Sequence, residues 1–447
     1  MSERKRTAFA SKVGLIMAAA GSAVGLGNIW KFPYIAGENG GGAFLVVYLL
    51  CVLLFGMPLL MTEFMIGKRS GKSAFGAFRA LSGSNRWQWL SWLCMLTAFV
   101  IMGFYFVVTG WCFNYLVEAA TNAFSGFGAQ ELTAHFDTIQ SSKPRMILFG
   151  ILPVLLTSAV LWFDVNKGIE RLSKILMPLL LGLMLLMAGV VLMMDGSSAG
   201  MRFFFRFDFD QITPQVIMEA MGQCFFSLSI GMGALITYGS YMPKGQNVIA
   251  TSVQVIVLDT IVALMAGVII FPAVFAFGFD PAEGPELVFV VLPAIFGQMT
   301  LPWLSSVLFF ALLCIAAITS TISLMEVVVA FICEASATKK HPLNRRQAVL
   351  ITSALVIALL VTCVFVPAVF TYSDLVSACM MMPLGALGMA VFVGWIQSRK
   401  KGNAVQPNEK WIKRWSRKFY LFVLRFIVPL AILLIVLNGL GVLKLPN

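Results

Sequence analysis

The sequence predicts an all-α polytopic membrane protein: two five-helix halves of inverted topology, with broken first and sixth helices, plus an eleventh helix. Of its 447 residues, 59% are hydrophobic and only 12% are charged, and the mean hydropathy is +0.89. Soluble chains carry about 45–50% apolar and roughly 25% charged residues. Because the apolar runs are long and continuous, they indicate helices and not a barrel. A soluble enzyme is excluded.

Eleven apolar stretches are long enough to cross a bilayer. They cover residues 12–36, 41–67, 87–121, 144–162, 168–193, 214–241, 247–278, 302–334, 347–366, 373–398 and 419–442. With the N-terminal tail (1–11) inside, 25 of the 32 Lys and Arg lie on the inner side and five on the outer side. This asymmetry predicts a multi-pass protein of the plasma (inner) membrane with a cytoplasmic N-terminus and an outer C-terminus. The basic charge therefore indicates topology and not a nucleic-acid partner.

Clusters of small and polar residues interrupt the first and sixth stretches, at 21–28 and 227–233. A single such cluster is also typical of close helix packing. Two clusters five spans apart favour a pair of five-helix repeats, 12–193 and 214–398, followed by the helix at 419–442. Unwound backbone at membrane depth is tolerated where it lines a cavity. The breaks are therefore predicted to form a binding site.

The residue types at these breaks indicate which ligands they would hold. A half-helix N-terminus offers free N–H groups that suit a carboxylate. Freed carbonyls, with Asn, Ser and Thr oxygens, suit a hard monovalent cation such as Na⁺. The triplet at 319–321 adds three hydroxyls, although alone it is more typical of helix–helix hydrogen bonds.

Several motifs along most of the chain are similar to those of one family. They are the segments 21–34, 38–44, 223–229, 292–296, 319–320 and 383–385. With them the chain resembles the neurotransmitter:sodium symporter family, and its eleven spans resemble the shorter bacterial branch. The resemblance implies Na⁺ as the coupling ion, with two sites, and no enzymatic activity.

The resemblance implies ligands for each ion and for the substrate. The first sodium site would use Ala23, Asn28, Ser227 and Asp259, and the second Gly21, Val24, Ala316, Thr319 and Ser320. The substrate would contact Ser22, Ala23, Gly25, Leu26, Gly27, Ile101, Tyr105, Phe226, Ser227, Ser229, Met232, Ser320 and Leu324.

Position 25 indicates the substrate class. Monoamine carriers of this family have an acidic residue there, whereas Gly25 leaves room for the carboxylate of an amino acid. The apolar side chains Ile101, Met232 and Leu324 would surround the substrate side chain. We therefore expect a hydrophobic or aromatic L-amino acid.

Asp259 is a carboxylate within a long apolar stretch, and such residues are functional by default. Many relatives carry Asn at this position, and some bacterial ones place a Glu one turn later, where this chain has Ala263. Asp259 would supply the negative charge that chloride supplies elsewhere. The resemblance therefore implies chloride-independent transport, while a proton-titrating Asp259 leaves H⁺ coupling open.

Further residues resemble gates above and below the site. Lys31, Gln223 and Asp374 would close the outer side above the substrate, with the Phe226 ring as a lid. Arg6, Ser240, Tyr241 and Glu334 would close the inner side. Gly168 and Pro178, which have nine residues between them, would let the fifth span unwind toward the cytoplasm.

The function expected from these observations is Na⁺-coupled symport of an amino acid by alternating access. The alternatives are H⁺ coupling or amino-acid exchange on the same fold, and a non-transporting amino-acid sensor. A sensor would be marked by a long soluble signalling segment, whereas the longest inner loop, 397–418, is merely basic. The sequence leaves the oligomeric state open.

Overall fold

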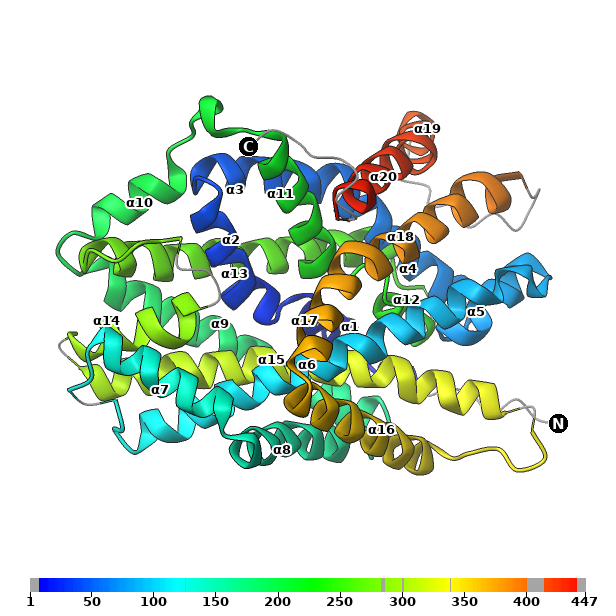
Figure 1. Ribbon diagram of the computed structural model, residues 1–447. Coiled ribbons are helices and arrows are strands. Elements are labelled where there is room, and N and C mark those ends of the chain that lie inside the picture. The colour runs from blue at the N-terminus through cyan, green and yellow to red at the C-terminus, as the bar shows by residue number, and fades with distance from the viewer. Residues whose placement is uncertain are drawn as a thin grey trace.

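The computed structural model describes residues 8–124, 126–243, 245–282, 286–299, 301–337, 339–399 and 414–439. Throughout these ranges the regular elements are helices, and no strand occurs among them. Figure 1 shows long helices that run roughly along one direction, with short helices at both ends of the bundle. The predicted all-α fold is thereby confirmed.

Nine continuous helical segments within the described ranges are long and apolar enough to span a membrane. They are Gly42–Ser70 (α3, η2, α4), Asn85–Ala120 (η3, α6), Lys143–Leu161 (α8), Asn166–Leu192 (η4, α9), Val248–Ala276 (α13), Pro302–Ser336 (α15), Arg345–Phe365 (α16), Pro367–Ile396 (α17, η7, α18, η8) and Arg417–Asn438 (α19, η10, α20). They correspond to nine of the eleven predicted stretches.

The other two predicted stretches are broken helices. The first consists of α1 (Lys12–Ala23) and the segment Gly27–Glu38 (η1 and α2), which meet at an angle of 47°. The second consists of α11 (Pro214–Ser227) and α12 (Ala234–Ser240), separated by residues 228–233. Each half is too short to cross a bilayer alone, since about 20 residues are needed. Both interruptions were predicted, and both are confirmed.

Local sequence explains where several of these helices begin. Ser11 caps α1 by accepting a hydrogen bond from the Gly14 N–H (3.0 Å), and Thr213, Asn247 and Asn344 cap α11, α13 and α16 in the same manner. Such oxygens satisfy N–H groups that have no partner within the helix.

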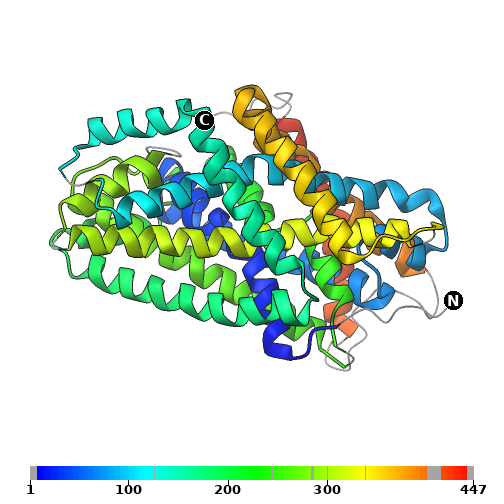
Figure 2. The same ribbon diagram turned by 90° about the horizontal axis from the view of Figure 1, so that it is seen from below.

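The broken helices lie inside the bundle, surrounded by the long spans. Helix α1 packs against α9, α13 and α15, and α15 packs along α6. Figure 1 shows α2 near the middle of the molecule, and in Figure 2 the dark blue first helix runs from the lower edge of the view to the middle. Helices α7 (Ala129–Ser141), α10 (Ser197–Phe205) and α14 (Leu292–Gly297) gather at one end, and α5 (Ala74–Ser82) lies at the other. The breaks are thus enclosed by protein and not by lipid.

Candidate functional site

The first break is held open by side chains from its own and a neighbouring helix. Helix α1 ends at Ala23, and Val24 adopts an extended conformation (φ −73°, ψ 111°). The Gly25 N–H donates to Asn28 Oδ1 (3.1 Å), and the Leu26 N–H donates to the Tyr105 hydroxyl of α6 (3.1 Å). These bonds replace the helical ones that the break removes, so the backbone remains satisfied within the membrane.

The second break needs backbone conformations that most residues avoid. Ser229, Gly231 and Gly233 have φ values of +54°, +96° and +77°, and glycine adopts this region without steric cost. The Gly231 N–H donates to Glu63 Oε1 of α4 (2.7 Å). Buried Glu63 therefore supports the unwound segment.

A direct hydrogen bond joins the two breaks. The Ser229 hydroxyl donates to the Ser22 carbonyl at 2.7 Å, across 207 positions of sequence. The Ser22 hydroxyl itself is buried and has no partner among the described residues. The breaks therefore meet at one place and leave a polar group there available to a ligand.

Four buried polar side chains form what we call the Asp259 cluster: Asn28, Tyr48, Ser227 and Asp259. Asn28 Nδ2 donates to Asp259 Oδ1 (2.7 Å). The Ser227 hydroxyl lies 2.9 Å from both carboxylate oxygens, and the Tyr48 hydroxyl lies 3.1 Å from Ser227 Oγ and 3.4 Å from Asp259 Oδ2.

The electrostatics of the Asp259 cluster favour a cation. Asp259 is 0% exposed, and within the described part of the chain no Lys, Arg or His pairs with it. A buried carboxylate without a counter-ion is costly. Three of the four residues predicted for the first sodium site meet here, and Ala23 lies at the adjoining end of α1.

Sequence reasoning missed Tyr48. The feature of the sequence that could have identified Tyr48 is a tyrosine within an otherwise apolar span, because a buried tyrosine hydroxyl usually has a polar partner. Nothing in the local sequence indicates that this partner lies 211 positions away, on α13.

A second group of oxygens lies where α1 meets α15. The Thr319 hydroxyl is 2.9 Å from the Ala316 carbonyl and 3.5 Å from the Val24 carbonyl, and the Ser320 hydroxyl is 3.4 Å from that same carbonyl. Gly21 faces Thr319 so closely that a Cβ would lie 3.2 Å from the Thr319 Cβ. The structure thus brings together all five residues predicted for the second sodium site. Their hydroxyl and carbonyl oxygens are uncharged, which suits a monovalent cation.

A cavity lies between the two breaks and helices α6 and α15. Eleven of the thirteen predicted substrate contacts line it: Ser22, Ala23, Gly25, Gly27, Ile101, Tyr105, Phe226, Ser229, Met232, Ser320 and Leu324. Leu26 and Ser227 are not among its lining residues; the Leu26 N–H donates to the Tyr105 hydroxyl, and the Ser227 hydroxyl donates to Asp259. The cavity has a volume of about 20 Å³. A larger ligand therefore requires its walls to move.

Two glycines set the shape of this cavity. A Cβ on Gly25 would collide with the Ser320 hydroxyl and lie 2.9 Å from the Tyr105 hydroxyl. A Cβ on Gly27 would lie 3.0 Å from the Phe226 ring. Any side chain at position 25 would occupy the space beside the hydroxyls of Ser320 and Tyr105.

Three predicted gate residues meet above the cavity. The Lys31 ammonium lies 3.2 Å from Asp374 Oδ1 of α17 and 4.5 Å from the centre of the Phe226 ring. Gln223 Nε2 donates to the Gly27 carbonyl (2.6 Å). The ion pair and the aromatic ring thus close one end of the cavity.

The predicted inner gate has a different set of contacts in the described part of the chain. The Tyr241 hydroxyl donates to Glu326 Oε1 (2.7 Å), and Arg345 binds both carboxylate oxygens of Glu326 (3.0 and 2.7 Å). Glu334 accepts from the backbone N–H of Ser73 (2.9 Å) and from its hydroxyl. The sequence interpretation counted Arg345 among topology charges and missed its pairing.

The N-terminal tail reaches this inner cluster. The predicted gate residue Arg6 lies outside the described residues, and Ser240 ends α12. The Phe9 N–H donates to the Tyr241 carbonyl (3.0 Å), and the Phe9 ring packs edge-on against Tyr238 and Tyr241. Phe9 therefore ties the tail to the end of the second broken helix.

The predicted hinge of the fifth span is partly irregular. Gly168 lies in a π-helical segment, η4 (Asn166–Glu170), and a Cβ there would collide with the Val160 carbonyl. Pro178 lies inside the regular helix α9 (Arg171–Leu192). The span is continuous between the two residues, with its irregular turn at the glycine.

Comparisons with known proteins agree with this geometry. A sequence model described as "Sodium:neurotransmitter symporter family" matches residues 6–131 and 127–446. The uncharacterized sodium-dependent transporter YhdH of Bacillus subtilis is 37% identical over 456 residues, which cover 99% of this chain and 100% of that protein. An uncharacterized sodium-dependent transporter of Haemophilus influenzae is 32% identical, covering 98% and 99%. The crystal structure of MhsT in complex with L-phenylalanine superposes with a TM-score of 0.88 at 37% identity, covering 97% and 100%.

Proposed function

The chain belongs to the sodium:neurotransmitter symporter family and is a sodium-dependent membrane transporter, not an enzyme; on this premise we propose that it takes up a hydrophobic or aromatic L-amino acid. The observation that carries the proposal is the cavity formed where the two broken helices meet. It combines hydroxyl groups at one side with the apolar side chains of Ile101, Met232 and Leu324 at the other.

The polar side of the cavity suits the ends of an amino acid. The space beside Gly25, next to the hydroxyls of Tyr105 and Ser320, is where the carboxylate would lie. The ammonium group would meet the carbonyls of the two breaks and the Ser229 hydroxyl. MhsT, whose structure holds L-phenylalanine, supports an apolar side chain in the remaining space.

Two sodium ions would bind beside this substrate. One would lie in the Asp259 cluster, where Asp259 balances its charge, and the other would lie between the Val24 carbonyl and the hydroxyls of Thr319 and Ser320. Each Na⁺ that moves inward across 100 mV contributes about 2.3 kcal/mol. Two ions would therefore support roughly a thousandfold accumulation.

Chloride would have no part in this cycle. Asp259 already places a negative charge within hydrogen-bond distance of Tyr48 and Ser227. A second anion beside a buried carboxylate would repel it. We also propose that the N-terminus lies in the cytoplasm, because most Lys and Arg lie on that side of the spans.

Transport by the purified protein in liposomes tests the proposal. We expect uptake of labelled leucine, phenylalanine, tyrosine or tryptophan when Na⁺ is outside, and none when K⁺ replaces it. Replacing chloride by gluconate should leave the rate unchanged. Uptake that persisted in K⁺ and followed a proton gradient would overturn sodium coupling. Tighter binding of glycine or alanine than of all four larger amino acids would overturn the substrate class.

A further inference from the structure

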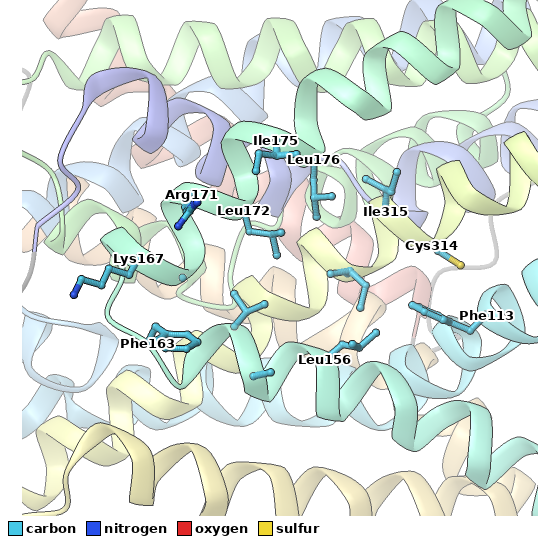
Figure 3. Close-up of a pocket in the computed structure, with 14 residues that line it drawn as sticks. Phe113, Leu156, Phe163, Lys167, Arg171, Leu172, Ile175, Leu176, Cys314 and Ile315 are labelled. Atoms are coloured by element: carbon cyan, nitrogen blue, oxygen red, sulfur yellow. The ribbon is translucent and has the colours of Figure 1, made fainter.

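A second and larger cavity lies away from the proposed substrate site. It is a groove between α8, α9 and α15 with a volume of about 570 Å³. Of its fourteen lining residues, twelve are uncharged and mostly apolar, and the remaining two are Lys167 and Arg171. Figure 3 shows these two cations at one end of the groove, with Phe113 and Cys314 at the other end.

The groove is open on the outer surface of the bundle. Leu156, Phe163 and Ile175 line it and are 43%, 53% and 58% exposed. Only 28% and 33% of the most apolar windows of α8 and α9 are buried within the protein, compared with 78% for α15. Because α8 and α9 are membrane spans, their exposed apolar side chains face the lipid chains and not water.

The two cations of the groove lie where the spans leave the membrane. Lys167 belongs to η4 just after the turn between α8 and α9, and Arg171 follows one helical turn later. Trp162, at the end of α8, contacts Arg346 at 5.4 Å, and tryptophan is typical of the membrane–water interface. The cations therefore lie at the depth of the lipid headgroups.

Neither cation has a protein partner in the described ranges. Both side chains are exposed, and neither makes a hydrogen bond or an ion pair within the described ranges. The neighbouring Lys174 differs, since it pairs with Glu170 at 2.6 Å. Asp164, in the same turn, does not line the groove. The charges at this end are thus available to an anion that lies along the groove.

We propose that this groove binds an anionic membrane phospholipid, with one acyl chain between α8, α9 and α15 and its phosphate against Lys167 and Arg171. The lining residues of η4 and α9, from Gly168 to Leu176, extend over about 12 Å at 1.5 Å per residue. A free phosphate would use the cations but not the apolar groove, and a neutral lipid would use the groove but not the cations. A basic pocket between membrane helices joins the two requirements.

Native mass spectrometry of the intact chain, titrated in detergent with phosphatidylglycerol or phosphatidylcholine, tests this site. We expect one phosphatidylglycerol molecule to bind more tightly than any further phosphatidylglycerol molecules, and more tightly than phosphatidylcholine. The variant Lys167→Gln/Arg171→Gln should lose roughly thirtyfold in phosphatidylglycerol affinity, the effect of two surface cations. Its affinity for phosphatidylcholine should remain unchanged.

A matched control removes two other exposed cations. Arg79→Gln/Arg86→Gln changes the net charge equally, in the connection between α4 and α6 and away from the groove. This variant should keep the affinity of the wild type. An equal loss in both double variants would show that phosphatidylglycerol responds to net charge alone, and this would overturn the site.

A third variant fills the groove without changing its charge. Ala159 lines the groove and is exposed on α8, so Ala159→Trp should lower the affinity for both lipids while the thermal unfolding temperature is unchanged. Unchanged phosphatidylglycerol binding would overturn the proposal. A wild-type dimer that Ala159→Trp dissociates would also overturn it, because a second copy of the chain would then cover the groove.

Discussion

The amide nitrogen of Asn28 donates a hydrogen bond to Asp259 at 2.7 Å, so the side-chain amide presents its hydrogens to the buried carboxylate. Its oxygen accepts from the Gly25 N–H instead. Sodium requires oxygen ligands, so a cation bound between these two residues would require the Asn28 amide to turn over. That rotation would release the Gly25 N–H beside the substrate cavity. Sodium binding at this place would thereby change the shape of the first break through one side chain.

Asp259→Asn should weaken sodium binding and make transport respond to chloride. Removing one partner of a buried charge pair costs about 2 kcal/mol or more, which is roughly thirtyfold in affinity. Uptake measured against Na⁺ concentration, in chloride and in gluconate, checks both effects. Ser252→Ala removes another buried polar group from α13 and should change neither. Equal uptake by Asp259→Asn in both anions would contradict the charge-balancing role.

Gly25→Ala should weaken substrate binding about tenfold or more while leaving the protein folded. The added methyl group would occupy the space beside the Ser320 and Tyr105 hydroxyls, and such overpacking costs about 1–3 kcal/mol, or tenfold and more in affinity. Scintillation proximity binding of a labelled amino acid measures this loss. Gly189→Ala is the control, because no atom lies within 4 Å of a Cβ there. Wild-type affinity in Gly25→Ala would place the carboxylate elsewhere.

The Lys31–Asp374 ion pair should hold bound substrate by a modest amount. Because Asp374 is 37% exposed, we expect a coupling of only ~0.5–1 kcal/mol in a double-mutant cycle. Lys31→Gln, Asp374→Asn and the double variant should each release substrate a few times faster. The free-energy change of the double variant, calculated from its release rate, should be smaller than the sum of the two single changes. Lys143→Gln, which removes another ammonium lying over a ring, Phe365, should not change the rate. Strict additivity would show that the pair does not act as a gate.

Arg345→Met should destabilise the protein more than removal of both partners of its ion pair. Glu326 is 0% exposed, and Arg345 is the cation that binds it. Breaking a buried pair from one side costs about 3–5 kcal/mol, whereas replacing both residues with apolar ones is often neutral. Apparent unfolding temperatures in detergent should therefore rank Arg345→Met below Arg345→Met/Glu326→Met. Tyr241→Phe, which removes one hydrogen bond to Glu326, should cost only about 1–2 kcal/mol.

Pro178→Ala should slow inward release of substrate more than it weakens binding. Proline removes a backbone hydrogen bond from the helix interior, so its replacement should stabilise the continuous form of α9. Binding affinity and the rate of counterflow in liposomes separate the two effects. Pro153→Ala is the control, since Pro153 also lies within a span, α8. Equal changes in affinity and release for Pro178→Ala would indicate an ordinary kink.

The amino-acid sequence was sufficient for the spans, their breaks and the principal charged residue of the site. Apolar length, glycine content and a carboxylate within an apolar run are local properties, and helix formation and membrane burial respond to them directly. For this reason both broken helices could be predicted, and Asp259 could be identified as a carboxylate within a span. The family resemblance extended the prediction to the eleven residues that line the cavity.

The partners of these residues depended on how distant spans pack. Tyr48 joins Asp259, Glu63 supports Gly231, and Arg345 neutralises Glu326. In each pair the two residues belong to different membrane spans, and neither flanking sequence indicates the other. A buried polar group must find a partner wherever the fold brings one within about 3 Å. Local sequence therefore specified which groups need partners, and helix packing specified which residues those partners are.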